Sequence, residues 1–239
     1  MEVLKKGSYV HIYEETLKMA NEVREKTGVN VYITVGPYPV DYLLFRQKLG
    51  REKALHLMMR GMEEAAEFYQ NHDICIGLGE IGRPHFEVEE EVTRDSNSIL
   101  IYGMECARDV GAPVILHTES TTPDTCKELV RMGKKVGLDA EKIVKHFSPP
   151  LILPEENYGL IPSVLATRKN LETSIKKGSR FMMETDYIDD PKRPGAVLGP
   201  KTVPRQTRKL LENGLMDEEQ AYRIHKDIPE KIYNISLDV

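Results

Sequence analysis

The chain has 239 residues, of which 40% are hydrophobic and 30% are charged, and this balance excludes a disordered polypeptide. Its net charge of −5 argues against a surface generally coated with nucleic acid, although it leaves room for a local basic patch. No run of 18 apolar residues occurs, and residues 1–6 lack an apolar core, so we expect neither a transmembrane helix nor a signal peptide.

Short apolar runs alternate with longer stretches of helical spacing along the whole chain. After a first helix at 12–27, strands are predicted at 29–35, 74–78, 113–116, 142–145, 158–164 and 180–183. Further helices are predicted at 52–69, 92–110, 122–136, 171–177 and 204–213. Apolar strands that alternate with helices indicate βαβ units around a parallel sheet, and the absence of a linker makes residues 1–239 one expected domain. Six strands suit an open sheet, whereas a closed parallel barrel needs eight.

Residues with metal-binding side chains follow four of the six predicted strands. These residues are Glu80, His117, His146 and Asp186. The carboxyl ends of parallel strands meet at one rim, so we expect the four side chains to converge. Two imidazoles and two carboxylates suit a divalent metal with open coordination positions for catalysis. Taken singly, each histidine also fits a buried structural role, and Asp186 also fits a helix N-cap.

These motifs resemble those of the TatD-like metal-dependent hydrolases. The segments that carry the resemblance are 79–82, 113–117, 146–148 and 184–186, and the resemblance is strongest to an archaeal branch of the family. The family belongs to the amidohydrolase superfamily and has a TIM-type (β/α)8 barrel, so the six strands here would be its third to eighth. The resemblance therefore implies an α/β barrel that is incomplete at its N-terminus, with about six βα units.

The resemblance also implies a missing pair of ligands. The family carries a His-x-His motif on its first strand, and this chain has no such motif. We therefore expect a site with one metal at best, or none, in a domain truncated at its N-terminus. An incomplete barrel exposes sheet edges, which a homo-oligomer or a rearrangement would have to cover.

The resemblance assigns roles to the candidate residues. Glu80 would bridge two metals, His117 and His146 would complete the second metal, and Asp186 would bind the first metal and orient or deprotonate the attacking water. The cofactor is one or two divalent ions, with Zn, Mg and Mn all open. His85 would act as an acid or base beside the metal, or is simply a polar loop residue.

Several cations are candidates for binding an anionic substrate. Arg83 and Arg168 follow predicted strands, where a guanidinium would hold an anionic group or would simply be a solvated loop cation. Residues 192–209 contain no acid and six basic residues, which are Lys192, Arg193, Lys201, Arg205, Arg208 and Lys209. This strip suits a phosphate or nucleic-acid contact surface, and it equally suits a solvated helix face.

The leading functional prediction is divalent-metal-dependent hydrolysis of a phosphate ester, either a small molecule or an oligonucleotide as in a nuclease. The alternatives are hydrolysis of another ester, an amide or a lactone, and a catalytically impaired remnant that binds only metal or a partner. Three cysteines without a CxxC pair favour a reducing, cytoplasmic setting, and no membrane partner is expected.

Overall fold

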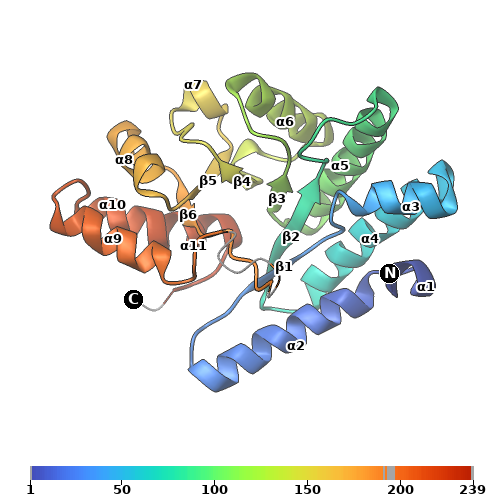
Figure 1. The fold of residues 1–239 in the computed structure, drawn as a ribbon, viewed down its shortest axis with the longest axis horizontal. Helices are drawn as coiled ribbons and strands as arrows, with labels where there is room; N and C mark the ends of the chain where they lie inside the picture. Colours follow the sequence, from blue (N-terminus) through green and yellow to red (C-terminus); the bar gives the residue numbers. More distant parts are fainter. Residues whose placement is uncertain (1, 191, 193–196, 238–239) are drawn as a thin grey trace. The chain divides into compact units, whose positions relative to one another are not determined.

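The computed structural model describes residues 2–190, 192 and 197–237, drawn as a ribbon in Figure 1. The chain divides into two compact units, each of which contains parallel strands alternating with helices. Unit 1 comprises the residues up to 119 together with 131–143, and unit 2 comprises 120–130 and 144–239. The helix α6 (Pro123–Val136) contributes residues to both units.

Unit 1 is built on three parallel strands, β1 (Ile33–Val35), β2 (Cys75–Gly82) and β3 (Val114–His117). The strands pair in chain order, β1 with β2 and β2 with β3. The register between β2 and β3 shifts between Gly79 and Ile81, so Glu80 lies at a bulge in β2. A bulge of this kind changes the direction in which a side chain points, and here it affects a predicted metal ligand.

In the described part of unit 1, five α-helices lie wholly within the unit, and the two longest cover its sheet. They are α1 (Glu2–Lys6), α2 (Val10–Thr27), α3 (Asp41–Leu49), α4 (Arg51–Asn71) and α5 (Glu90–Val110). Helices α4 and α5 pack against each other and against β2, as Figure 1 shows. Met58, Met62 and Ala65 recur at helical spacing on α4 and are buried, so they contribute to the core of this unit.

Unit 2 repeats the pattern with β4 (Ile143–Ser148), β5 (Ile161–Leu165) and β6 (Met182–Glu184), again parallel and paired in chain order. Its helices are α7 (Pro154–Asn157), α8 (Arg168–Lys177), α9 (Thr202–Glu212), α10 (Glu218–Tyr222) and α11 (Ile228–Tyr233). A π-helical turn, η2 (Arg223–Asp227), joins α10 to α11, and the short 3-10 helix η1 (Ala140–Lys142) precedes β4. Phe181, Leu171 and Leu210 lie in the hydrophobic core of unit 2.

The structure confirms the predicted α/β class with six βα units, each strand lying where an apolar run predicted one. The first strand is shorter than predicted, because Val29 is 59% exposed and the strand begins only at Ile33. Helices α1, α3, α7, α10 and α11 were not predicted. Among the described residues, no helix is long and apolar enough to cross a membrane.

Candidate metal centre

In unit 1, the end of β2 and the end of β3 bring a carboxylate and an imidazole together. His117 Nδ1 lies 3.1 Å from Glu80 Oε2. The other ring nitrogen of His117, Nε2, lies 2.9 Å from Nδ1 of His85, in the loop after β2. Tyr38 packs edge-on against the His117 ring at a centroid distance of 5.3 Å. Both nitrogens of His117 therefore face a polar partner, and its ring is further confined by an aromatic neighbour.

Glycines make this close approach of β2 and β3 feasible. Gly82 has φ 152°, and a Cβ atom there would lie 1.9 Å from the carbonyl oxygen of His117. A Cβ atom on Gly79 would lie 2.6 Å from Cβ of Ile115. The amide of Arg83 donates to the same His117 carbonyl at 3.0 Å. The backbone of the loop after β2 is thus fixed directly to the residue that carries the imidazole.

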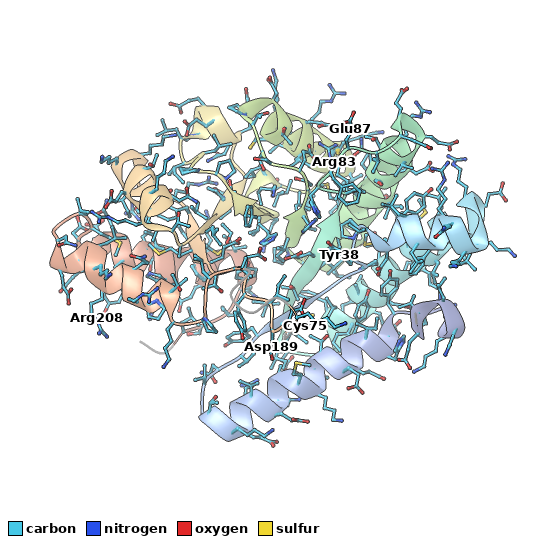
Figure 2. All side chains as sticks on the ribbon, viewed as in Figure 1. Tyr38, Cys75, Arg83, Glu87, Asp189 and Arg208 are labelled. Atoms are coloured by element: carbon cyan, nitrogen blue, oxygen red, sulfur yellow. The ribbon has the colours of Figure 1, made fainter. Side chains whose placement is uncertain are left out.

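Arg83 anchors the loop that carries His85. Its side chain is buried, with Nε and Nη2 donating to the two carboxylate oxygens of Glu119 at 2.9 and 2.5 Å. Its Nη1 donates to Asn97 at 2.9 Å. Figure 2 shows the side chains of Arg83 and Tyr38 in this unit. A two-point guanidinium–carboxylate pair is geometrically specific, so it ties the loop after β2 to the segment after β3.

In unit 2, a carboxylate orients the imidazole at the end of β4. Nδ1 of His146 lies 3.0 Å from Oε1 of Glu184, and Nε2 lies 3.6 Å from Oδ1 of Asp186. The backbone amide of Phe147 donates to the same Glu184 oxygen at 2.9 Å. One carboxylate oxygen thus accepts from two successive residues of β4. The His146 ring is buried, whereas Phe147, next in sequence, is 47% exposed.

Phe147 and Asp186, which flank this imidazole, both have left-handed backbone conformations. Their φ angles are 52° and 48°. Such conformations cost energy in residues other than glycine and cluster at functional sites. Phe147 lies within β4, where the register with β5 is irregular, and Asp186 lies two residues after the end of β6. These conformations accompany the approach of Asp186 to His146.

The two pairs lie at or close to the separation that two ligands of one divalent ion have. Two ligands that each lie about 2.0–2.1 Å from one ion are separated from each other by roughly 3 to 3.4 Å. The His117–Glu80 pair, at 3.1 Å, falls within this range, and the His146–Asp186 pair, at 3.6 Å, lies just above it. In both units the remaining ring nitrogen of the histidine has a hydrogen-bonding partner, as is usual for histidines that bind metals. The donor sets therefore fit a metal.

Sequence reasoning identified Glu80, His117, His146 and Asp186 but missed the role of Glu184. Glu184 was noticed only as part of the motif at the end of β6. The signal that would have found it is its position, because Glu184 is the last residue of its strand, and strand ends are where the other candidate ligands were sought. The expectation that all four ligands share one rim concerns both units and stays a prediction.

The predicted substrate-binding arginines lie in different surroundings. Arg83 is buried in the ion pair described above. Arg168 begins α8, is exposed, and pairs with Glu172 one turn later at 2.6 Å. On α9, Arg205 and Arg208 are exposed, and Figure 2 shows Arg208 on the outer side of that helix. Of the basic strip, Arg193 lies outside the described residues.

Arg168 and Lys209 also line a shallow cavity of about 570 Å³ between α8 and α9. Two acids, Glu172 and Glu212, line the same cavity. This mixed charge does not favour an anionic ligand, so the exposed cations elsewhere on α9 remain the better candidates for contact with phosphate.

Comparison with known proteins gives one family and a set of structural neighbours. The family model described as TatD related DNase matches residues 3–234. An uncharacterized protein of Methanocaldococcus jannaschii is 44% identical over 217 residues, which are 91% of this chain and 77% of the relative.

Two solved hydrolase structures illustrate the fold. The organophosphorus hydrolase of Deinococcus radiodurans superposes with a TM-score of 0.60 at 17% identity, over 89% of this chain and 73% of that protein. The phosphotriesterase homology protein of Escherichia coli, solved with phosphate in its active site, gives a TM-score of 0.59 at 16% identity, over 89% and 77%. Likeness at this level of identity concerns the fold, and it confirms an incomplete TIM-type barrel.

Proposed function

The chain belongs to the family of TatD-related DNases, which are metal-dependent hydrolases, and from this premise we propose that it hydrolyses phosphate esters, including the phosphodiesters of oligonucleotides. The observation that carries the proposal is the pairing of an imidazole with a carboxylate at ligand spacing in each unit. Each of these imidazoles is also oriented through its second nitrogen. Orientation of this kind is characteristic of residues that bind a metal.

We assign the role of metal ligand to Glu80 and His117 in unit 1 and to His146 and Asp186 in unit 2. A bound divalent ion would lower the pKa of water toward neutrality and would offset negative charge on the phosphoryl oxygens. Glu184 accepts a hydrogen bond from the protonated Nδ1 of His146, so Nε2 of that ring presents its lone pair. Asp186 orients the attacking water and accepts its proton, because its carboxylate is the acceptor next to that lone pair.

The exposed cations of α9 support a phosphate-containing substrate. Arg205 and Arg208 project from a helix whose first turn has no acid, in a chain of net charge −5. A local positive surface on an acidic protein attracts phosphate backbones and raises their local concentration. We therefore assign Arg205 and Arg208, and not the buried Arg83, to contact with the substrate.

The test is a substrate panel with the metal under control. Protein stripped by a chelator is assayed with Zn²⁺, Mn²⁺ or Mg²⁺ on bis(4-nitrophenyl) phosphate, a labelled single-stranded oligonucleotide, an aryl ester and a lactone. We expect metal-dependent turnover of the two phosphodiesters. Asp186→Asn should lower kcat by about 10²- to 10⁴-fold, since it removes a proton acceptor.

The matched control is Asp189→Asn, a change of the same chemistry at an exposed residue three positions further on. Turnover confined to the ester or the lactone would replace the proposal with an amidohydrolase or lactonase function. Metal binding without any turnover would leave a remnant that only binds metal. Equal rates in Asp186→Asn and Asp189→Asn would exclude Asp186 from the reaction.

We also propose a reducing, cytoplasmic setting for the enzyme. Cys75, Cys106 and Cys126 are free thiols. Burial raises the pKa of each thiol to about 11, so all three stay protonated at neutral pH. Mass spectrometry of the protein isolated without reductant should find three unmodified thiols, and a disulfide would contradict this setting.

A further inference from the structure

His85 comes from a loop, yet its ring lies against a residue at the end of a strand. Its Nδ1 atom is 2.9 Å from Nε2 of His117, and the two ring centroids are 5.0 Å apart with the planes at 75°. The contact is made to the nitrogen of His117 that does not face Glu80. The two contacts of His117 therefore use opposite sides of its ring.

The direction of this hydrogen bond follows from the chemistry of a ligand histidine. A neutral imidazole carries one proton, and the nitrogen that binds a metal must be the unprotonated one. In the proposed metal site Nδ1 of His117, on the side of the Glu80 carboxylate, is the nitrogen that binds the ion, so the proton of this ring is on Nε2, which then donates to Nδ1 of His85. The proton of His85 is accordingly on its own Nε2.

From this geometry we propose that His85 is a positioning residue that fixes the tautomer and the ring orientation of His117 for metal binding. This assignment, which rests on the proposed metal-dependent function, replaces the acid–base role expected from the sequence. The Nδ1 lone pair of His85 is used in accepting from His117. When the nitrogen that does not bind the metal is already hydrogen-bonded, the histidine ring loses less rotational freedom on metal binding. The affinity of the site for the metal is therefore higher.

The loop is built to hold His85 in place. The preceding Arg83 is buried and is fixed by Glu119 and Asn97, and Pro84 between them restricts the backbone. Glu119 lies two residues after His117, so the same segment that carries the ligand also anchors the loop. A residue with no function at this position would not need such support, whereas a group that must keep a 2.9 Å contact does.

The experiment measures metal affinity directly. Metal-stripped wild-type protein and the variants His85→Ala, His85→Asn and His56→Ala are titrated with Zn²⁺ and with Mn²⁺ by calorimetry. We expect His85→Ala to weaken binding by about 10- to 100-fold, the usual effect of removing the partner of a ligand histidine. His85→Asn should restore most of the affinity, because its side-chain oxygen can accept from His117 at nearly the position of Nδ1.

His56→Ala is the matched control, since His56 is exposed on α4 and has no part in the arrangement. Thermal unfolding of the metal-free variants should be unchanged, because His85 is an exposed residue in a loop. Wild-type affinity in His85→Ala would overturn the proposal, and so would equal weakening in His85→Asn and His85→Ala, because that result would mean that no acceptor at this position matters.

The outcome is separable from that of the proposed function. Weaker metal binding in His85→Ala, in a protein that hydrolyses no phosphodiester, would support the positioning role and contradict the assigned substrate. Phosphodiester turnover together with wild-type metal affinity in His85→Ala would support the substrate and overturn the positioning role. A wild-type protein that binds neither metal would overturn both.

Discussion

The two units orient their ligand histidines by different means. In unit 2 the nitrogen of His146 that faces away from Asp186, Nδ1, contacts the carboxylate of Glu184, whose side chain is 15% exposed. In unit 1 the nitrogen of His117 that faces away from Glu80, Nε2, contacts the imidazole of His85 in an exposed loop. A hydrogen bond to an ionised acceptor is roughly twice as strong as one between neutral groups. His146 is therefore the more rigidly prepared ligand, and His117 the more adjustable one.

The two histidines also present different nitrogens. His146 uses Nδ1 for its support and directs Nε2 at Asp186, whereas His117 directs Nδ1 at Glu80 and uses Nε2 for its support. The Nε2 atom is farther from the backbone than Nδ1, so the first arrangement reaches farther from its strand. In each unit the hydrogen-bonding partner must meet the ring nitrogen that stays protonated. The path of the backbone decides this, because each partner comes from a different segment than its histidine.

The largest effect should come from removing either histidine. His117→Ala and His146→Ala each delete an assigned ligand, so the metal content measured by elemental analysis after gel filtration should fall strongly in both. The exposed His56→Ala variant should retain the wild-type content. Unchanged content in both ligand variants would show that these histidines are structural.

A smaller effect should follow from neutralising the support in unit 2. Glu184→Gln keeps the shape of the side chain but removes the charge that accepts from His146 and from the Phe147 amide. We expect the metal dissociation constant to rise by about 10- to 100-fold, and by more than in His85→Ala. Glu172→Gln, which alters an exposed ion pair with Arg168, is the matched control. A larger loss in His85→Ala than in Glu184→Gln would reverse the order of rigidity argued above.

Acid should destabilise unit 1 through a residue remote from the metal ligands. The buried Asp95 accepts from Arg51 and from Tyr42, and the hydrogen bonds from Arg51 hold its pKa below the usual value. Since the folded-state pKa is lowered, the stabilisation is present above the unfolded-state pKa and is lost as pH falls through the folded-state value.

Asp95→Asn should therefore lower the free energy of unfolding at neutral pH by about 1 to 3 kcal/mol, the range for hydrogen bonds to charged groups. It should also flatten the decline of stability that we expect in the wild type as the pH falls through the folded-state pKa of Asp95. Urea unfolding at several pH values measures both effects. Parallel pH profiles for the two proteins would show that Asp95 is not the group that titrates.

The smallest effect is expected from the cations of α9 in unit 2. Arg205→Ala combined with Arg208→Ala should raise KM for an oligonucleotide more than it lowers kcat, because these groups bind phosphate equally in ground and transition states. The slope of log KM against log salt should fall by about 1.4, since two fewer counterion-releasing contacts form on a single strand. Lys134→Ala with Lys135→Ala, an exposed pair on α6, is the control. Equal slopes in wild type and the α9 variant would mean that this helix face is only solvated.

Continuous apolar runs predicted all six strands, because a strand buried on both faces has few polar positions. The ligand types were predictable for a related reason, since a strand end is where the apolar run stops and the functional side chain begins. Helix α3 was missed because only Tyr42 and Phe45 of its nine residues are buried, so its periodicity is weak. The last helical region was missed because the π-helical turn η2 interrupts the regular spacing.

The hydrogen-bonding partners that orient the two histidines could not be predicted from the sequence, for a different reason. His85 lies 32 positions from His117, and Glu184 lies 38 positions from His146. No local sequence pattern indicates which distant residue contacts which nitrogen of a histidine ring. The left-handed conformation of Phe147 was equally hidden, because phenylalanine rarely adopts it and nothing in the neighbouring residues announces it.

The contact at Gly82 limits how this protein can change over evolutionary time. A single added carbon there would collide with the His117 carbonyl, so this junction of two strands tolerates no side chain. Natural drift and laboratory libraries alike must leave this position fixed. New substrate preferences would have to come from the loops beyond it, such as residues 86–89, where the chain is free of that collision and most side chains face solvent. The close spacing of β2 and β3 at Gly82 must therefore be kept, whereas the sequence of the loops that follow the strands can change.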